Sequence, residues 1–258
     1  MNKKILFIIM IVSLLSGIGG GLVLKIIDSK IINRYGITSY SQYGEDLICS
    51  NIFQFLKIQN PTYIDIGANH PIMGNNTYYF YKNGSRGILI EPNPAMYKLL
   101  TTKRNGDKVL NCGIGVTTTR EADFYMIDNG EIGWDTFSKD DAENAEKVSN
   151  GKHKITKIIK IPLVNINEVF QKYLNGKAPD LCSIDVEGFE MPILKSINFH
   201  RFRPVVFCIE TVMYDSFDSS DSIIRFMRSK NYTMRGRNIV NLVFVDDFIF
   251  NKIGLIKK

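Results

Sequence analysis

The sequence predicts an α/β fold with a mostly parallel sheet and helices on both faces. Short apolar runs that each end in a carboxylate alternate with helical patterns, as in βαβ units. These runs cover residues 63–65, 87–91, 181–185 and 205–210. Open α/β sheets bind ligands at the carboxyl ends of their strands. The four acids (Asp65, Glu91, Asp185 and Glu210) are therefore expected on one rim, although a polar turn alone also explains any single one.

The first run leads into the loop Gly67-Ala68-Asn69-His70. A dinucleotide site would need the pattern G-x-G-x-x-G to hold a pyrophosphate, and here the second and third glycines are missing. S-adenosylmethionine fits better, because it lacks phosphates and carries a ribose diol, an amino group and a sulfonium that favour carboxylate partners. Glu91 follows Asp65 near the offset of about 20 residues at which an acid reaches ribose hydroxyls.

Five successive motifs carry a family resemblance. They occupy residues 41–46 (Ser-Gln-Tyr-Gly-Glu-Asp), 65–71, 90–94, 111–115 and 184–190. Together they resemble the motifs of the FkbM-type methyltransferases, in the same order, across residues 41–246. The resemblance implies a Rossmann-like class I methyltransferase fold with a seven-stranded, mostly parallel sheet. Such proteins use S-adenosylmethionine, usually to methylate hydroxyls of sugars or other natural products. The implied cofactor-binding residues are Asp65, Gly67, Ala68, Asn69, Glu91, Pro92, Asn93, Gly113, Ile114 and Asp185.

A membrane anchor is predicted ahead of this domain. Residues 5–24 carry no charge, and at 1.5 Å per residue such a helix spans about 30 Å, the thickness of a bilayer core. A cleavable signal is the alternative, since small residues follow Leu15, but the apolar run exceeds the usual signal length. The predicted organisation is an anchor or signal segment at 1–25, a linker at 26–40 and a methyltransferase domain at 41–258.

The side of the membrane is predicted from chemistry, because the flanking charges are nearly balanced. The methyl donor is made in the cytosol. Cys112, Cys182 and Cys208 fall in or beside predicted buried strands, where they are expected as reduced packing residues. A single-pass membrane protein with a cytoplasmic catalytic domain is therefore expected.

The composition limits the classes of binding partner that are expected. The net charge of +6 is modest, and no basic stripe interleaved with aromatic residues is present, so nucleic acid is not an expected partner. Scattered lysines indicate a solvated surface, with attraction to anionic lipid or an acidic glycan as the alternative.

The remaining elements follow from periodicity. Predicted helices cover residues 44–56, 75–83, 94–104, 166–174, 191–197 and 222–230, and additional strands cover 109–112, 122–127, 158–163, 232–235 and 242–246. The last two strands form an antiparallel hairpin. The charged segment 128–157 is expected to be either an acceptor-binding lid or an exposed connector.

Catalysis is assigned to a few side chains. Methyl transfer needs the acceptor held in line with an activated donor, and a hydroxyl acceptor also needs a base. Asp185 and Glu187 share a face while strand geometry continues, so one is a candidate base, or the pair holds a divalent metal such as Mg²⁺; Glu187 capping the next helix is the alternative. His70 is a second candidate base or a loop hydrogen-bonding residue, and Glu210 with Thr211 is a further acceptor contact.

The predicted function is therefore an S-adenosylmethionine-dependent O-methyltransferase that acts on a glycan or glycolipid precursor. One alternative is a membrane-associated nucleotide-sugar glycosyltransferase that uses Asp185 and Glu187 as its metal site. That alternative leaves the Gly67 loop and Glu91 unexplained. A noncatalytic, membrane-tethered binding module is the other alternative.

Overall fold

The computed structural model describes residues 36–128, 135–149, 152–211 and 218–255. The chain divides into two compact units, Met1–Ser39 and Tyr40–Lys258. All of the helices and strands in the described ranges belong to the second unit. The predicted anchor (1–25) and most of the predicted linker (26–40) lie outside the described residues. Within the described ranges, no helix has the length and apolar character needed to cross a membrane.

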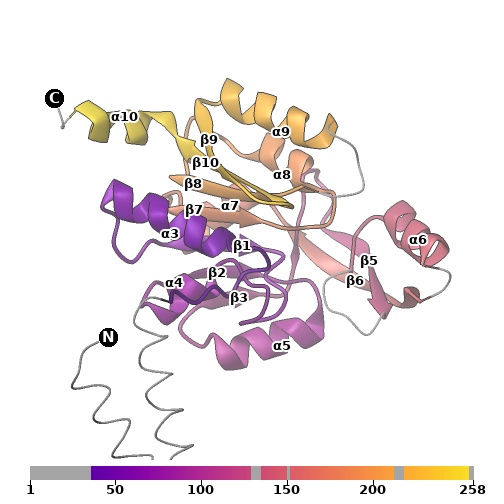
Figure 1. The fold of residues 1–258 in the computed structure, drawn as a ribbon. Coiled ribbons are helices and arrows are strands. Elements are labelled where there is room, and N and C mark those ends of the chain that lie inside the picture. Colours follow the sequence, from indigo (N-terminus) through magenta and orange to yellow (C-terminus); the bar gives the residue numbers. More distant parts are fainter. Residues whose placement is uncertain (1–35, 129–134, 150–151, 212–217, 256–258) are drawn as a thin grey trace, which may run out of the picture. The chain divides into compact units, whose positions relative to one another are not determined.

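The main sheet has seven strands in the order β3-β2-β1-β7-β8-β10-β9, and Figure 1 shows it at the centre of this unit. The strands are β1 (Tyr63–Ile66), β2 (Gly87–Ile90), β3 (Lys108–Leu110), β7 (Leu181–Ile184), β8 (Val206–Glu210), β9 (Tyr232–Arg237) and β10 (Asn241–Asp246). The strands from β3 to β8 pair in parallel, whereas β10 is antiparallel to both β8 and β9. The predicted seven-stranded, mostly parallel sheet is confirmed.

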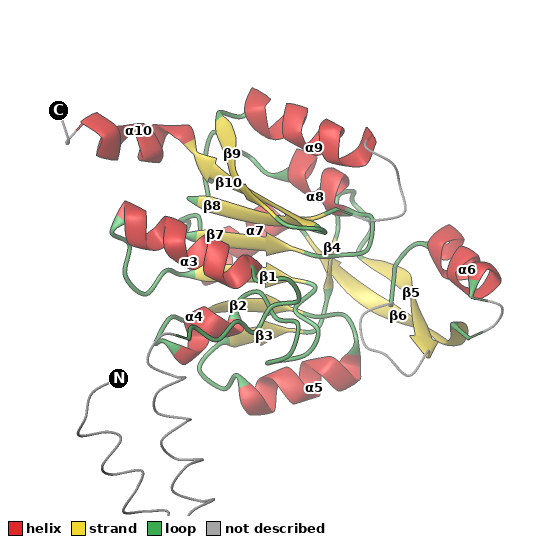
Figure 2. Ribbon diagram, in the orientation of Figure 1, coloured by secondary structure: helices red, strands yellow, loops and turns green. Residues whose placement is uncertain are grey.

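Helices cover both faces of this sheet, as predicted (Figure 2). One face packs against α3 (Glu45–Leu56), α4 (Tyr78–Lys82), α5 (Pro94–Lys103) and α10 (Asp247–Leu255). The other face packs against α7 (Ile166–Tyr173), α8 (Glu190–Ser196) and α9 (Asp218–Ser229). Strands β1, β2, β7 and β8 are almost entirely buried, which explains why they read as continuous apolar runs.

The cysteines are part of this core. All four are free and buried, so the prediction that Cys112, Cys182 and Cys208 are reduced packing residues is confirmed. Burial raises the pKa of the Cys112 thiol to about 12, which makes it unreactive at neutral pH.

A second, three-stranded sheet was not predicted. It contains β4 (Gly113–Ile114), β5 (Glu121–Asp128) and β6 (Lys154–Val164) in the order β4-β6-β5. Helix α6 (Lys139–Val148) packs on it, with Ala142 and Ala145 against Tyr125 and Ile127. We call β5, β6 and α6 the inserted unit. Much of the predicted lid or connector (128–157) is thus α6 and the start of β6, while residues 129–134, which include Trp134, and residues 150–151 lie outside the described residues.

Candidate active site

The loop after β1 closes tightly on the neighbouring strands. Gly67 has a φ of +83°, and a Cβ atom added there would lie 1.8 Å from the backbone oxygen of Asp185. The backbone N–H groups of Gly67 and Ala68 both donate to the carbonyl of Ile90, at 2.9 and 3.1 Å. Only glycine allows this approach. The loop therefore lies between the ends of β2 and β7, where strand order reverses and α/β sheets bind ligands.

Asp65 is buried beneath that loop. Its Oδ2 accepts a hydrogen bond from Thr77 Oγ1 at 2.7 Å and a longer one from Asn75 Nδ2 at 3.4 Å. Burial raises the pKa of Asp65, whereas the Thr77 hydroxyl and the Arg104 guanidinium lower it. Asn75 also donates to the carbonyl of Ala68 at 2.8 Å. The contacts of Asp65 are thus internal and hold the loop in place, and its direct contact with a cofactor stays a prediction.

Arg104 anchors the same network and was missed by the sequence analysis. Its side chain is fully buried and pairs with Asp107 at 2.8 Å. It also donates to the side chains of Asn75, Thr77 and Tyr63, at 3.0 to 3.1 Å. Arginine at a helix end is usually solvated, so the local sequence carries no signal of this role. The predicted helix over 75–83 starts only at Tyr78 because Asn75 and Thr77 serve this network.

Glu91 joins the loop to the start of α5. The carboxylate accepts from the backbone N–H groups of Asn69 and Asn93, each at 2.7 Å, and the residue is 4% exposed. Burial raises the pKa of Glu91 to about 7, against the two backbone hydrogen bonds that lower it. A carboxylate oxygen has two lone pairs, so each oxygen keeps one for a ligand hydroxyl. The structure brings together Asn69, Glu91, Pro92 and Asn93, four of the predicted cofactor-binding residues.

Both polar atoms of the Asn93 side chain make hydrogen bonds within the protein. Its Oδ1 accepts from the N–H groups of Ala95 and Met96 and so caps α5, while Nδ2 donates to Asp135 Oδ2 at 2.6 Å. The other oxygen of Asp135 accepts from the N–H of Ile127 at 2.8 Å. Asp135 was also missed, because an acid in a charged segment has no distinguishing local pattern.

Gly113 and Ile114 form strand β4 and are buried. A Cβ atom on Gly113 would lie 2.5 Å from the Phe137 ring and 2.9 Å from the Leu163 side chain. Glycine is therefore required here, because a larger residue would clash with Phe137, which precedes α6 in the sequence, and with Leu163, which follows it. The expected contact of Gly113 and Ile114 with adenine stays a prediction.

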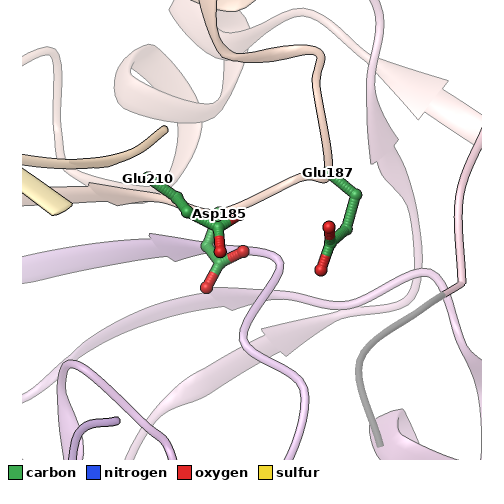
Figure 3. Close-up of side chains that lie close together, drawn as sticks. All are labelled: Asp185, Glu187 and Glu210. Atoms are coloured by element: carbon green, nitrogen blue, oxygen red, sulfur yellow. The ribbon is translucent and has the colours of Figure 1, made fainter. Parts of the chain in front are cut away.

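A cluster of carboxylates lies at the carboxyl ends of β7 and β8. Asp185, Glu187 and Glu210 each place one oxygen within 4.8 Å of the others, and Figure 3 shows Glu187 reaching toward the other two from the loop after β7. Asp185 and Glu210 share a hydrogen bond, and burial followed by carboxylate repulsion raises the pKa of Asp185 well above its usual range. Burial also raises the pKa of Glu210 to about 7 and that of Glu187 to about 8. The cluster therefore retains protons at neutral pH and has the oxygen donors that a divalent cation prefers.

A turn brings Glu187 into the cluster. Strand β7 ends at Ile184, and Glu187 and Gly188 have φ angles of +54° and +102°. Continued strand geometry was expected to place Asp185 and Glu187 on the same face, and this reason is wrong because the strand has already ended. The two side chains nevertheless lie close together, as predicted. Glu187 does not cap α8, because the N-cap residue is Phe189 and no side chain makes a capping hydrogen bond there. Glu190 instead accepts from the N–H groups of Val186 and Gly188 in the preceding turn, at 3.1 Å each.

His70 is held as a hydrogen-bonding residue of the loop. Its Nδ1 accepts from the N–H groups of Ile72 and Met73, at 3.2 and 3.0 Å. Desolvation lowers the pKa of His70. Because Nδ1 accepts two hydrogen bonds, the neutral ring carries its proton on Nε2 and is a donor there. These contacts match the loop-bonding alternative and argue against His70 as the base.

Comparison with known proteins then identifies the family. The family model described as "Methyltransferase FkbM domain" matches residues 65–234. The chain belongs to the FkbM methyltransferase family. It is therefore an S-adenosylmethionine-dependent methyltransferase, and the predicted family and cofactor are confirmed. A comparison with curated proteins found no match.

Solved structures similar to this FkbM methyltransferase are distant in sequence. An FkbM methyltransferase from Methylobacillus flagellatus is 17% identical, with a TM-score of 0.43, over 72% of this chain and 43% of that one. A TehB-like S-adenosylmethionine-dependent methyltransferase from Corynebacterium glutamicum is 10% identical, with a TM-score of 0.41, over 86% and 96% of the two chains. The 1,6-didemethyltoxoflavin-N1-methyltransferase from Burkholderia thailandensis, solved with S-adenosylhomocysteine, is 11% identical, with a TM-score of 0.39, over 87% and 88%.

Proposed function

We propose that this methyltransferase methylates a hydroxyl of a sugar in a glycan, glycolipid or polysaccharide precursor. The observation that carries the proposal is the proton-holding cluster of Asp185, Glu187 and Glu210 next to the Gly67 loop. A sugar hydroxyl loses its proton only with the help of a base, whereas a more acidic acceptor would not require one. A carboxylate whose pKa lies near the working pH is suited to that task.

The residues divide into a donor half and an acceptor half. The Gly67 loop and Glu91 hold the methyl donor, with the Glu91 carboxylate toward the ribose hydroxyls. When bound, S-adenosylmethionine supplies an activated methyl group on its sulfonium. In that transfer, the acid cluster would accept the proton of the acceptor hydroxyl.

Within the cluster, Glu187 is the proposed proton acceptor. Asp185 and Glu210 are hydrogen-bonded to each other, so they share a proton and orient one another. Burial, and after it the neighbouring carboxyl groups of Asp185 and Glu190, raises the pKa of Glu187 to about 8, so about half of Glu187 is ionised at pH 8. A divalent cation bound by the three carboxylates is the second mechanism that the oxygen set favours, because it would lower the pKa of a bound hydroxyl.

The proposal extends to location. Residues 5–24 form an uncharged apolar run long enough to span a bilayer, and four reduced, buried cysteines suit a cytosolic catalytic domain. We therefore place the catalytic domain at the cytoplasmic face, next to membrane-bound glycan precursors. Protease protection of the full-length protein in sealed membrane vesicles tests this orientation.

Transfer of a labelled methyl group tests the function. Full-length protein in detergent is incubated with labelled S-adenosylmethionine and a panel of sugars, glycolipids, amines and carboxylic acids, and the products are analysed by mass spectrometry. Labelling of a sugar hydroxyl supports the proposal, whereas labelling of amines alone contradicts O-methylation. Parallel reactions with EDTA and with added Mg²⁺ separate the two mechanisms.

A further inference from the structure

Asp135 connects the inserted unit to the main sheet through both of its carboxylate oxygens. One oxygen accepts from Asn93 Nδ2 at 2.6 Å and the other accepts from the N–H of Ile127, in β5, at 2.8 Å. A register shift between Met126 and Ile127 interrupts the pairing of β5 with β6 at this point. The neighbouring Thr136 pairs with Tyr125 through two backbone hydrogen bonds. The fold thus fixes the Asp135 carboxylate between β5 and the start of α5.

Asn93 extends this connection to Glu91. Its backbone N–H donates to one Glu91 oxygen at 2.7 Å, while its side chain donates to Asp135. The charge of Asp135 also raises the pKa of Glu91, after burial as the main cause. A continuous series of hydrogen bonds therefore joins Ile127 in the inserted unit to the carboxylate assigned to the ribose hydroxyls.

The inserted unit reaches the acid cluster at a second place. Asp141, in the first turn of α6, has its Oδ2 3.8 Å from the position of a Cβ atom on Gly188. Its charge adds to the raised pKa of both Glu187 and Glu190. The same unit thus adjoins the donor half of the site through Asp135 and the acceptor half through Asp141.

We propose that Asp135 is a positioning residue. It couples binding of the cofactor to the position of the inserted unit, and the inserted unit forms one wall of the acceptor site. The inference rests on the proposed function, since it assigns the acceptor to the acid cluster. A ribose bound to Glu91 restrains Asn93, and through Asp135 it restrains β5 and α6. Cofactor binding therefore favours acceptor binding, and acceptor binding favours cofactor binding to the same extent.

The polarity of the Asn93–Asp135 contact makes the idea testable. The Asn93 amide is not free to rotate, because its oxygen caps α5. In Asp135→Asn, an amide that still accepts from Ile127 N–H must place its NH₂ against the NH₂ of Asn93. In Asn93→Asp the cap is kept, but two carboxylates face each other. The double variant Asn93→Asp/Asp135→Asn restores every hydrogen bond, and donor and acceptor are exchanged only between residues 93 and 135.

The experiment uses full-length wild-type protein, the two single variants, the double variant and a control, Asp123→Asn. Asp123 lies in β5 of the same unit and pairs with Lys160 on the surface. Calorimetry measures the Kd for S-adenosylhomocysteine, and hydrogen exchange measures protection of the α6 amides when that ligand is added. Each single variant should raise the Kd about tenfold and lose the ligand-dependent protection. The double variant should regain part of the affinity and protection that both single variants lose, and the control should resemble wild type.

Two results would overturn the inference. A double variant no better than the worse single variant would show that the hydrogen bond does not carry the coupling. Single variants that lower the melting temperature but keep the Kd and the ligand-dependent protection would give Asp135 a purely structural role. Failure of the wild-type protein to bind S-adenosylhomocysteine would instead contradict the proposed function, and the inference with it.

Discussion

The protonation state of Glu91 should control cofactor affinity. Burial raises its pKa to about 7 in the free protein, whereas only the ionised carboxylate accepts from both ribose hydroxyls and both backbone N–H groups. If the ionised form alone binds, the apparent Kd equals the intrinsic Kd divided by the ionised fraction. That fraction is about 0.1 at pH 6 and about 0.9 at pH 8, so affinity should rise about tenfold between these values.

The same ionisation affects stability with the opposite sign. Because the folded-state pKa of Glu91 is raised from 4.5 to about 7, the free protein favours the protonated carboxyl. The stability contributed by this group is present below pH 4.5 and is lost as the pH rises through about 7. Ligand binding should reverse the preference and release a proton near pH 7.

Calorimetric titration with S-adenosylhomocysteine at several pH values, in buffers of different ionisation enthalpy, measures both the affinity and the released proton. Glu91→Gln should bind weakly and with little dependence on pH, because its amide turns a donor toward one backbone N–H. Glu146→Gln, an exposed site on α6, is the matched control and should behave as wild type. A wild-type affinity that is flat from pH 6 to 8, or the same slope in Glu91→Gln, would refute the reasoning.

The remaining predictions concern the loop, the buried arginine and the acid cluster. Gly67→Ala should unfold at a lower temperature and lose cofactor binding, because its Cβ would lie 1.8 Å from the Asp185 carbonyl oxygen; an unchanged melting temperature with normal affinity would contradict this. Arg104→Met should lower the unfolding free energy in urea by about 3–5 kcal/mol, because it leaves Asp107 buried without its cation; a loss below about 1 kcal/mol would show that the network adds little. Asp185→Asn and Glu187→Gln should keep the Kd for S-adenosylhomocysteine within about threefold and lower kcat by about 10²–10⁴. An equal loss of binding and turnover would show that these acids serve the donor half of the site.

Local pattern alone determined the framework of this protein. Buried parallel strands require continuous apolar runs, and their carboxyl ends require polar turns, so the strands bearing Asp65, Glu91, Asp185 and Glu210 were recognisable without coordinates. Gly67, two residues after Asp65, was likewise a local signal, because a tight turn needs a positive φ. The family motifs rest on these same positions, which explains why the fold and the methyl donor could be predicted together.

Tertiary structure alone decided how the polar side chains are used. Asp65 faces a buried network instead of the rim, and Glu187 joins the cluster through a left-handed turn that strand periodicity does not describe. Arg104 and Asp135 look like ordinary surface charges in the sequence, yet each makes its key contacts with residues distant along the chain. The physical reason is that apolar burial follows a period readable from the chain, whereas a polar side chain has several rotamers and takes its partner from whichever segment the fold brings beside it.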